Sequence, residues 1–205
     1  MVAELVTIRH NNIIASTKQA SNIMKKTFPN RTFKALGDRM DFTDALVKNG
    51  WRLLGSGAFA SAYGHKDHDV VMKIGYIENN EAYLDFVAEM QKSPRHENLP
   101  RIYGITRFVN STKVKREDRV DEYFVVIMEK LDESRKYRYG EDRKSKAFRK
   151  WYDGIKSKVC YHDDSDPLVA LIKRAHERGA YHTIDMHYGN VMFRGDVPVI
   201  TDPIC

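Results

Sequence analysis

The pattern of hydrophobic and polar residues changes period at Trp51. In residues 1–50, apolar positions recur loosely at helical spacing, with an interruption at Phe28-Pro29-Asn30. We expect a helical extension there that stops near Asn49-Gly50. From Trp51, the short β-prone runs WRLLG, SAYGH and DVVMKIGY are separated by Gly, His and Asp. They predict an antiparallel meander of three strands.

A helix and two further strands are expected next. In NNEAYLDFVAEMQKS, the apolar residues Ala82, Phe86 and Met90 are spaced four apart, and Pro94 ends the pattern. The runs RIYGITRF and EYFVVIME then read as strands separated by the polar segment 110–121. The first half of the chain therefore has the predicted order of three strands, one helix and two strands.

The last third of the chain contains a clear helix signal. In DSDPLVALIKRAHERGA, Ser165 or Asp166 can cap the helix and Pro167 suits its first turn. An apolar stripe then extends toward Gly179. The polar loop YHTIDMHYGN follows, and VMFRGDVPVITDP predicts a hairpin that turns at residues 194–196.

Composition limits the class of protein. The 205 residues are 42% hydrophobic, which is enough for one large packed domain or two small lobes. The sequence has no run of about 18 apolar residues and no signal-peptide pattern at its start, so we expect a soluble, cytoplasmic protein. The two cysteines, Cys160 and Cys205, form no disulfide or zinc pattern and suit a reducing compartment.

Positive charge is concentrated in one segment. The net charge is +6, and residues 135–158 alone carry ten Lys or Arg against three acidic residues. Such a run is most often the solvated face of a helix. It is also a candidate surface for an acidic protein or a nucleic-acid-associated partner.

A glycine pair and a lysine form the first candidate site. The pattern G-x-G-x-x-A at residues 55–60 lies between two expected strands, so it does not fit a Rossmann or Walker loop, and a plain hairpin is the simplest interpretation. Lys73, however, is the one cation on an otherwise apolar strand, and a buried ammonium needs an anion. Val71 and Lys73 share a face under strand alternation. Lys73 is therefore expected either to reach a phosphate beneath a glycine flap or to extend its ammonium to solvent at the strand edge.

The helix that follows offers carboxylates for this lysine. Glu81, Asp85 and Glu89 are spaced four apart and so lie on one face. We expect Glu89 to be the main partner of Lys73, with Glu81 as the rival.

The terminal hairpin carries the remaining chemistry. Asn190 opens the expected hairpin and Asp202 closes it. Pairing of residues 191–193 with 198–200 would bring these two side chains together, and their oxygens suit Mg²⁺. Asp185 would then be placed to orient an attacking hydroxyl or to accept its proton. His182 and His187 lack a third zinc ligand, and we expect His187 to form structural hydrogen bonds.

In order and nearly in spacing, these motifs resemble the protein-kinase-like fold. Within it, LGSGAFASAYGH, DMHYGNVMF and GDVPVITDP are most similar to the early serine/threonine protein kinases of T-seven-like podophages. The resemblance covers about residues 51–204. It implies an α+β, bilobal protein-kinase-like fold with an N-lobe of one antiparallel sheet and one helix (51–131) and a reduced helical C-lobe (132–205), preceded by the helical extension (1–50) expected from the spacing of apolar residues.

The resemblance also implies a role for each matching residue. Lys73 would bind the α- and β-phosphates of ATP, Asp185 would be the catalytic aspartate, and Met128 would stand at the adenine pocket. The expected catalytic residues are Asp185, Lys73 and Glu89, and the expected Mg²⁺ ligands are Asn190 and Asp202. The expected ATP-binding residues are Leu54, Gly55, Ser56, Gly57, Ala62, Val71, Lys73, Met128, Glu129 and Leu131.

The implied function is a phage-encoded, ATP- and Mg²⁺-dependent serine/threonine kinase that phosphorylates host bacterial proteins during host takeover. Three departures from typical kinases stand out: Thr183-Ile184-Asp185 replaces H-R-D, Asp202-Pro203-Ile204 replaces D-F-G, and no A-P-E motif follows. The surfaces that could then hold the acceptor are the basic segment 135–158 and the N-terminal helices, and we expect the basic segment to do so. One alternative is a kinase-like binding protein that inhibits host machinery, such as transcription, through that segment. A small-molecule kinase is another, because D-x-H-x-G-N is similar to the pattern of aminoglycoside kinases.

Overall fold

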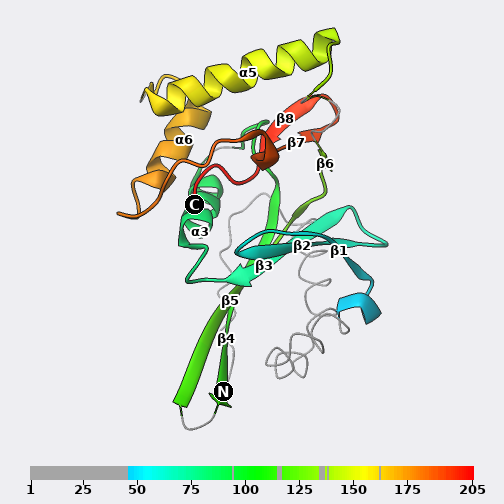
Figure 1. Ribbon diagram of the computed structural model, residues 1–205, viewed down its shortest axis with the longest axis vertical. Coiled ribbons are helices and arrows are strands. Elements are labelled where there is room, and N and C mark those ends of the chain that lie inside the picture. Colours follow the sequence, from blue (N-terminus) through cyan, green and yellow to red (C-terminus); the bar gives the residue numbers. More distant parts are fainter. Residues whose placement is uncertain (1–45, 94, 115–116, 134–136, 138, 162) are drawn as a thin grey trace. The chain divides into compact units, whose positions relative to one another are not determined.

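The computed structural model describes residues 46–205 apart from 94, 115–116, 134–136, 138 and 162 (Figure 1). Most of the helical extension expected over residues 1–50 therefore lies outside the described residues. Its last turn is helical at residues 46–48 and ends at Gly50, whose φ of 87° is a left-handed conformation that favours glycine. The predicted stop near Asn49-Gly50 is confirmed.

The chain forms two compact units. The first contains the described residues up to Asn80 together with Arg101–Lys130, and the second contains Glu81–Pro100 and Leu131–Cys205. The chain passes from the first unit to the second between Lys130 and Leu131, next to the lobe boundary that we expected after residue 131. The helix after the third strand, expected in the N-terminal lobe, groups with the second unit.

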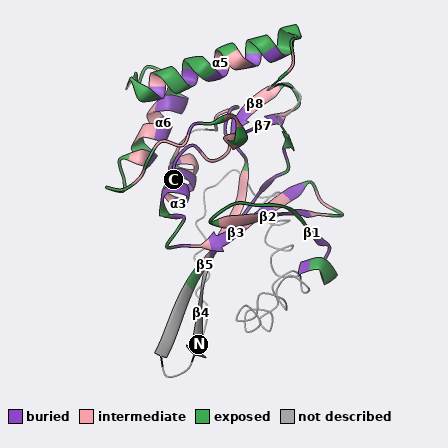
Figure 2. Ribbon diagram, viewed as in Figure 1, coloured by how far each residue is buried: buried purple, intermediate pink, exposed green. Residues whose placement is uncertain are grey.

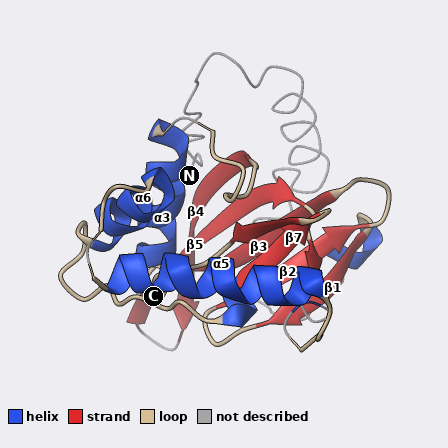
Figure 3. Cartoon of the chain, turned by 90° about the horizontal axis from the view of Figure 1, so that it is seen from above, coloured by secondary structure: helices blue, strands red, loops and turns tan. Residues whose placement is uncertain are grey.

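A five-stranded antiparallel sheet makes up most of the first unit (Figure 3). Its strands follow the order β1-β2-β3-β5-β4, so the predicted meander of three strands is confirmed. A core on one face joins Trp51, Tyr63, Met72 and Ile127 with neighbouring apolar residues. The strand bounds are β1 Trp51–Ser56, β2 Ala60–His65, β3 Val70–Tyr76, β4 Ile102–Val114 and β5 Glu117–Glu129.

The polar segment 110–121 differs from its prediction. It was expected to separate two short strands, but β4 continues to Val114 and β5 begins at Glu117, which makes each strand 13 residues long. Their pairing extends from Ile102 opposite Met128 to Val114 opposite Glu117. Antiparallel pairing satisfies the backbone whatever the side chains are, so a polar composition does not end the ladder.

The second unit combines helices with a three-stranded sheet of order β6-β7-β8. The helix and hairpin predictions are confirmed here, including a turn at Gly195 with φ of 62°. Asp166 caps α6 by accepting the N–H of Leu168, and Pro167 occupies the first turn. The element bounds are α3 Glu81–Lys92, β6 Asp132–Glu133, α5 Arg143–Cys160, α6 Pro167–His176, a 3-10 turn η2 Tyr188–Asn190, β7 Val191–Arg194 and β8 Val197–Ile200.

Residues 143–158 of the basic segment lie in helix α5, in agreement with the solvated-face interpretation. Its buried side is made by Ser145, Phe148, Tyr152, Ile155 and Val159, and Figure 2 shows exposed and buried residues recurring along it. The rest of its surface is exposed or partly exposed and largely cationic. In the part of the chain that the structure describes, no helix is long and apolar enough to span a bilayer.

Candidate functional site

Lys73 projects from the face of the first sheet that lies opposite the core. Val70, Met72 and Ile74 of β3 are buried in the core, so the intervening Val71 and Lys73 point to the other side. Both are partly buried. The prediction that Val71 and Lys73 share a face is confirmed.

Strand register places two further candidate residues on the same face. Ala62 of β2 pairs with Lys73, and Met128 of β5 pairs with Val71. Residues directly opposite in a sheet point to the same side, so all four side chains share one surface. Met128 is buried and Ala62 is partly buried.

Leu54 also covers this surface. The register of β1 shifts between Leu53 and Gly55, which marks an irregularity at Leu54. A Cβ built on Gly64, which pairs with Val71, would lie 3.2 Å from both terminal methyl carbons of Leu54. Leu54 therefore lies over Gly64, on the side of the sheet that carries Val71.

The glycines of the flap between β1 and β2 are not required by the surrounding protein. Neither Gly55 nor Gly57 has a positive φ. Among the described residues, a Cβ on Gly55 would meet nothing within 4 Å, and one on Gly57 would lie 3.7 Å from the Ala60 carbonyl oxygen. The missing side chains leave room for a ligand to approach the backbone. Gly57 donates its own N–H to that Ala60 oxygen at 2.8 Å, which closes the turn, and the Ser56 and Ser61 hydroxyls lie 2.5 Å apart.

Two residues that the sequence analysis did not identify hold the flap against β3. The buried Asn80 donates from Nδ2 to the carbonyl oxygens of Phe59 and Tyr76, at 3.1 and 2.7 Å. Gly75 lies directly under the flap, because a Cβ there would be 2.5 Å from the Phe59 oxygen. The glycine inside the run VVMKIGY was the available sequence signal for such a close backbone approach.

The end of β5 is occupied by contacts within the first unit. The buried Glu129 carboxylate accepts the Arg101 N–H at 2.7 Å and lies 3.7 Å from the Arg101 guanidinium. The Glu129 N–H donates to the Arg101 oxygen, and the Lys130 N–H donates to the Asp69 oxygen. The Glu129 side chain is therefore structural, and Leu131 is the next residue with a backbone donor.

In the second unit, Asp185 and Asn190 are brought together by the loop that joins them. Asn190 Nδ2 donates to the Asp185 carbonyl oxygen at 2.8 Å and to Asp185 Oδ2 at 3.1 Å. These bonds fix the amide, so Asn190 Oδ1 points away from them. No described residue donates a hydrogen bond to Asn190 Oδ1 or to Asp185 Oδ1. One oxygen of each side chain is thus available for a ligand.

The hairpin joins Asn190 to the segment that carries Asp202. The Thr201 N–H and hydroxyl both donate to the Asn190 carbonyl oxygen, at 2.8 and 3.0 Å. Val191 pairs with Ile200, as the hairpin prediction required. Thr201, a contact that the sequence analysis missed, continues this pairing by one residue and so places Asp202 immediately beyond it.

Asp202 is close enough to Tyr83 of α3 to influence its ionisation. Burial raises the pKa of Tyr83 well above its ordinary value, and the Asp202 charge raises it further. Tyr83 therefore gives up its proton even less readily than an ordinary tyrosine. Tyr83 was not identified from the sequence.

The two expected metal ligands, an amide and a carboxylate, are of the type that Mg²⁺ takes, and Mg²⁺ binding here stays a prediction. Among the described residues, no three His, Cys, Asp or Glu side chains cluster in a metal-binding arrangement. The hairpin instead offers the Asn190 amide oxygen and the Asp202 carboxylate. Mg²⁺ typically takes one or two such protein ligands and completes its shell with phosphate oxygens and water.

His187 has a structural hydrogen bond, as predicted. Its Nδ1 accepts the Gly189 N–H at 3.0 Å, and a Cβ on Gly189 would lie 2.6 Å from the ring. The ring therefore requires glycine at that position. His187 Nε2 also lies 3.5 Å from Asp185 Oδ2, a contact with the candidate catalytic residue that the sequence did not indicate.

The last residues of the sequence pair with the loop that carries Asp185. Thr183 and Cys205 exchange backbone hydrogen bonds at 2.7 and 3.0 Å, and the Asp185 N–H donates to the Pro203 oxygen at 2.8 Å. Ile184 and Ile204 form an isolated antiparallel bridge between these bonds. The pairing fixes the backbone of Asp185 relative to that of the residues following Asp202.

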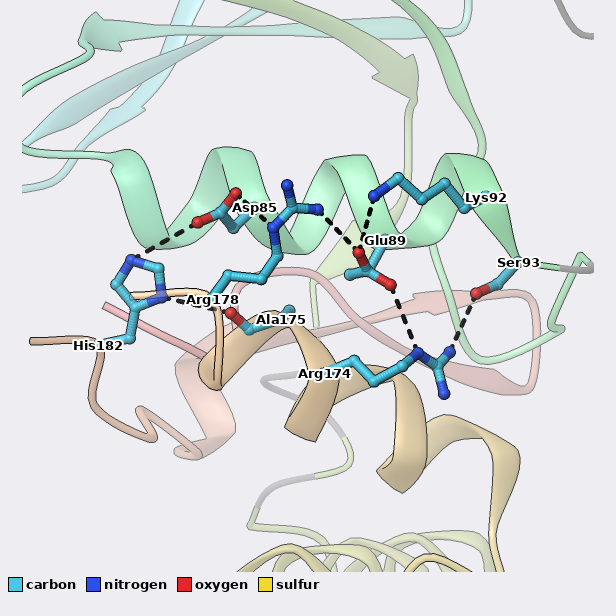
Figure 4. A network of polar contacts seen from close by, with 8 residues as sticks. All are labelled: Asp85, Glu89, Lys92, Ser93, Arg174, Ala175, Arg178 and His182. Carbon is cyan, nitrogen blue, oxygen red and sulfur yellow. Dashed lines mark hydrogen bonds and ion pairs between the residues drawn. The ribbon is translucent and has the colours of Figure 1, made fainter. Parts of the chain in front are cut away.

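Glu89, the expected main partner of Lys73, has other partners in the second unit (Figure 4). Its Oε1 lies 2.8 Å from Arg178 Nη1 and 3.1 Å from Lys92 Nζ, and its Oε2 lies 3.4 Å from Arg174 Nε. This buried carboxylate with three cations around it joins α3 to α6, and its pairing with Lys73 stays a prediction. The rival, Glu81, is exposed at the first residue of α3, and its pairing with Lys73 stays a prediction.

The environment of Glu89 predicts an acid-sensitive contribution to stability. Burial alone would raise the pKa of Glu89, but hydrogen bonds from Lys92, Arg178 and Arg174 outweigh it and lower the pKa below its ordinary value of 4.5. The folded state therefore binds the proton less readily than the unfolded state. The stabilisation is fully present above about pH 4.5 and is lost as pH falls through the folded-state pKa.

We expect Glu89→Gln to lower the free energy of unfolding by roughly 1–3 kcal/mol at pH 7, because hydrogen bonds to a charged group are lost while partly exposed cations are screened. The deficit should shrink below about pH 4.5, where the wild-type carboxylate is itself protonated. Urea unfolding at pH 7, 5 and 3.5 measures it. The matched control is Glu78→Gln. Glu78 is exposed, so its substitution should not change the free energy of unfolding at any of these pH values. An equal deficit at all three pH values would contradict this account.

Comparison with known proteins identifies the family. No curated protein matches the chain. One solved structure that it resembles is the crystal structure of the pseudokinase PEAK1 (Sugen Kinase 269), with 14% sequence identity and a TM-score of 0.29. That alignment covers 75% of this chain and 42% of the other, so the chain spans less than half of the solved structure. The model of the bacteriophage T7 protein kinase 0.7 family matches residues 3–205, and the chain belongs to that family.

Proposed function

We propose that this phage kinase transfers the γ-phosphate of ATP to serine or threonine hydroxyls of host bacterial proteins in the host cytoplasm. Membership of the family supports phosphotransferase activity. The observation that carries the proposal is the Asp185–Asn190 pair. Asp185 Oδ2 accepts the hydrogen bond that Asn190 Nδ2 donates, which leaves Asp185 Oδ1 and Asn190 Oδ1 available. This division suits a base that orients a hydroxyl beside a metal ligand.

Each candidate residue has a separate role in the proposed phosphoryl transfer. Asp185 Oδ1 accepts the hydrogen bond, and then the proton, of the attacking hydroxyl. Asn190 and Asp202 would hold Mg²⁺, which when bound would neutralise charge on the phosphates. Lys73 binds the α- and β-phosphates from the sheet face that it shares with Val71 and Ala62. Positioning and charge neutralisation account for the rate, so no covalent intermediate on the protein is needed.

Adenine is expected to lie on the face of the first sheet formed by Leu54, Ala62, Val71 and Met128. The N–H groups of Glu129 and Lys130 are used by Arg101 and Asp69. Of the segment 129–131, this leaves the Leu131 N–H as the candidate donor to the adenine edge. The open space at Gly55 and the missing side chain at Gly57 would give the phosphates access to the backbone of the flap.

The choice of protein acceptors rests on α5. We define its basic face as Arg143, Lys146, Lys150 and Lys156, all of which are exposed. No ion pair to a described residue involves Arg143, Lys150 or Lys156, and Lys146 has a 3.7 Å contact with the exposed Glu141. Arg143 and Lys146 also lie in the first turns of the helix, where the macrodipole disfavours cations. An acidic segment of a protein substrate would relieve this repulsion.

Incubation of the purified protein with γ-labelled ATP, Mg²⁺ and host lysate tests the proposed function. Label on polypeptides, recovered as phosphoserine or phosphothreonine, is the expected result. Label on small metabolites would contradict the proposal and indicate a small-molecule kinase. Inhibition of host machinery without transferred label would favour the kinase-like binding protein.

Charge reversal on α5 separates acceptor binding from chemistry. In Arg143→Glu/Lys150→Glu, we expect the KM for an acidic protein substrate to rise by about 2- to 30-fold, as for the loss of two exposed ion pairs, with kcat unchanged. Glutamate at the first position of α5 suits the helix dipole, so the fold should persist. Lys144 is left intact because it pairs with Asp196 at 2.7 Å.

Lys48→Glu/Lys66→Glu provides the matched two-charge control, because both lysines are exposed in the first unit. Steady-state kinetics at 50 and 200 mM salt measure the effect, which should weaken at the higher salt. An equal change in KM for the control variant would show that net charge, and not α5, recruits the substrate.

A further inference from the structure

Helices α3 and α6 are joined by a network of charged side chains on their facing sides (Figure 4). We define the α3–α6 network as Asp85 and Glu89 from α3, Arg174 from α6, and Arg178 and His182 from the segment that follows α6. Arg178 is its centre. The Arg178 guanidinium lies 3.0 Å from Asp85 Oδ1 through Nε and 2.8 Å from Glu89 Oε1 through Nη1.

Arg178 therefore bridges two carboxylates that lie one helical turn apart on α3. Contacts through two nitrogens of one planar guanidinium fix its direction as well as its distance from α3. The Glu89 side chain is only 11% exposed, so the loss of Arg178 would leave a largely buried carboxylate with fewer cations. The network thus holds the segment after α6 at a defined height along α3.

His182 extends the network toward the catalytic loop. Its side chain is 8% exposed, its Nε2 lies 3.8 Å from Asp85 Oδ2, and its Nδ1 lies 3.3 Å from the Ala175 carbonyl oxygen. A Cβ on Gly179 would overlap the His182 ring, so the ring packs directly on that glycine. His182 therefore contacts Asp85 of α3, the last turn of α6 and the glycine that lies between α6 and His182 in the sequence.

Only two residues separate His182 from Asp185. The backbone of Thr183 is hydrogen-bonded to that of Cys205, and the backbone of Asp185 to that of Pro203. The loop is thus held at His182 by side chains and from Thr183 onward by backbone pairing. A displacement of His182 would also displace Asp185, because the two residues between them are too few to absorb the movement.

We propose, on the basis of the proposed function, that Arg178 and His182 are positioning residues that hold Asp185 in place through Asp85 of α3. Glu89 contributes to the same positioning, because it is the second carboxylate that Arg178 contacts. Arg174, which joins Glu89 to Ser93, lies on the other side of the network from His182 and stabilises the helix pair without reaching the loop.

The experiment compares Arg178→Met and His182→Gln with Arg174→Met as the matched control. All three remove network contacts, so each is expected to lower the free energy of unfolding. Kinetics are measured at a temperature where thermal melts show every variant to be folded. Arg178→Met and His182→Gln should lower kcat about tenfold with the KM for MgATP unchanged, as expected for a small misplacement of a reacting group. Arg174→Met should retain wild-type kcat, and Arg178→Lys should recover part of the loss.

Amide hydrogen exchange gives a readout that does not depend on activity. The Asp185 N–H, which donates to the Pro203 oxygen, should exchange at least tenfold faster in Arg178→Met than in Arg174→Met. Equal exchange and equal kcat in these two variants would overturn the proposal, because the network would then only stabilise the helix pair. If the wild-type protein transfers no phosphate, the proposed function fails, and the exchange rates alone decide whether the network holds the loop.

Discussion

Replacement of Asp185 by asparagine is expected to lower kcat for phosphoryl transfer by about 10²- to 10⁴-fold, the usual contribution of a general base. Asparagine keeps the size of the side chain and can still accept the hydrogen bond that Asn190 donates to Oδ2. It removes the negative charge that would orient and deprotonate the acceptor hydroxyl. The fold and the KM for MgATP should therefore change little, because Asp185 is not expected to bind nucleotide.

Initial rates with γ-labelled ATP and a generic protein acceptor provide the measurement, with urea unfolding to check the fold. Asp67→Asn is the control, because Asp67 is an exposed carboxylate on the turn before β3. Transfer by Asp185→Asn within about tenfold of the wild type would show that another group acts as the base.

The second large effect is expected at Asp202. In Asp202→Asn, the carboxylate that we propose as a Mg²⁺ ligand becomes a neutral amide. The affinity for Mg²⁺ in the nucleotide complex should therefore decrease, and transfer at a fixed Mg²⁺ concentration should fall by about 10²-fold or more. Tyr83 stays neutral beside this position and so offers no replacement charge. Higher Mg²⁺ should restore part of the activity, because affinity is what the substitution removes.

Thermal melts test the same assignment without an enzymatic readout. ADP with Mg²⁺ should raise the Tm of the wild-type protein more than ADP with EDTA does, since a ligand that binds the folded state stabilises it. In Asp202→Asn the difference between the two conditions should largely disappear, whereas Asp67→Asn should behave like the wild type. An unchanged Mg²⁺-dependent shift in Asp202→Asn would remove Asp202 from the metal site.

Local patterns in the sequence predicted much of the first sheet and of the terminal hairpin. The face shared by Val71 and Lys73 follows from strand alternation, and the hairpin at Gly195 follows from a turn signal between two apolar runs. The cap at Asp166 and the stop at Gly50 are likewise local. Each of these features depends on residues a few positions apart, where backbone geometry leaves few alternatives.

The sequence by itself thus determined the order of the elements, the face of β3 that carries Lys73, and the two ends of the hairpin that carries Asn190 and Asp202. The tertiary structure alone decided which charges meet. Helical spacing does not distinguish Glu81, Asp85 and Glu89. Only the packing of α3 on α6 brings Glu89 into contact with Arg174 and Arg178. A choice among equivalent carboxylates depends on residues more than 80 positions away, and no local periodicity reports which helix face a distant arginine will reach.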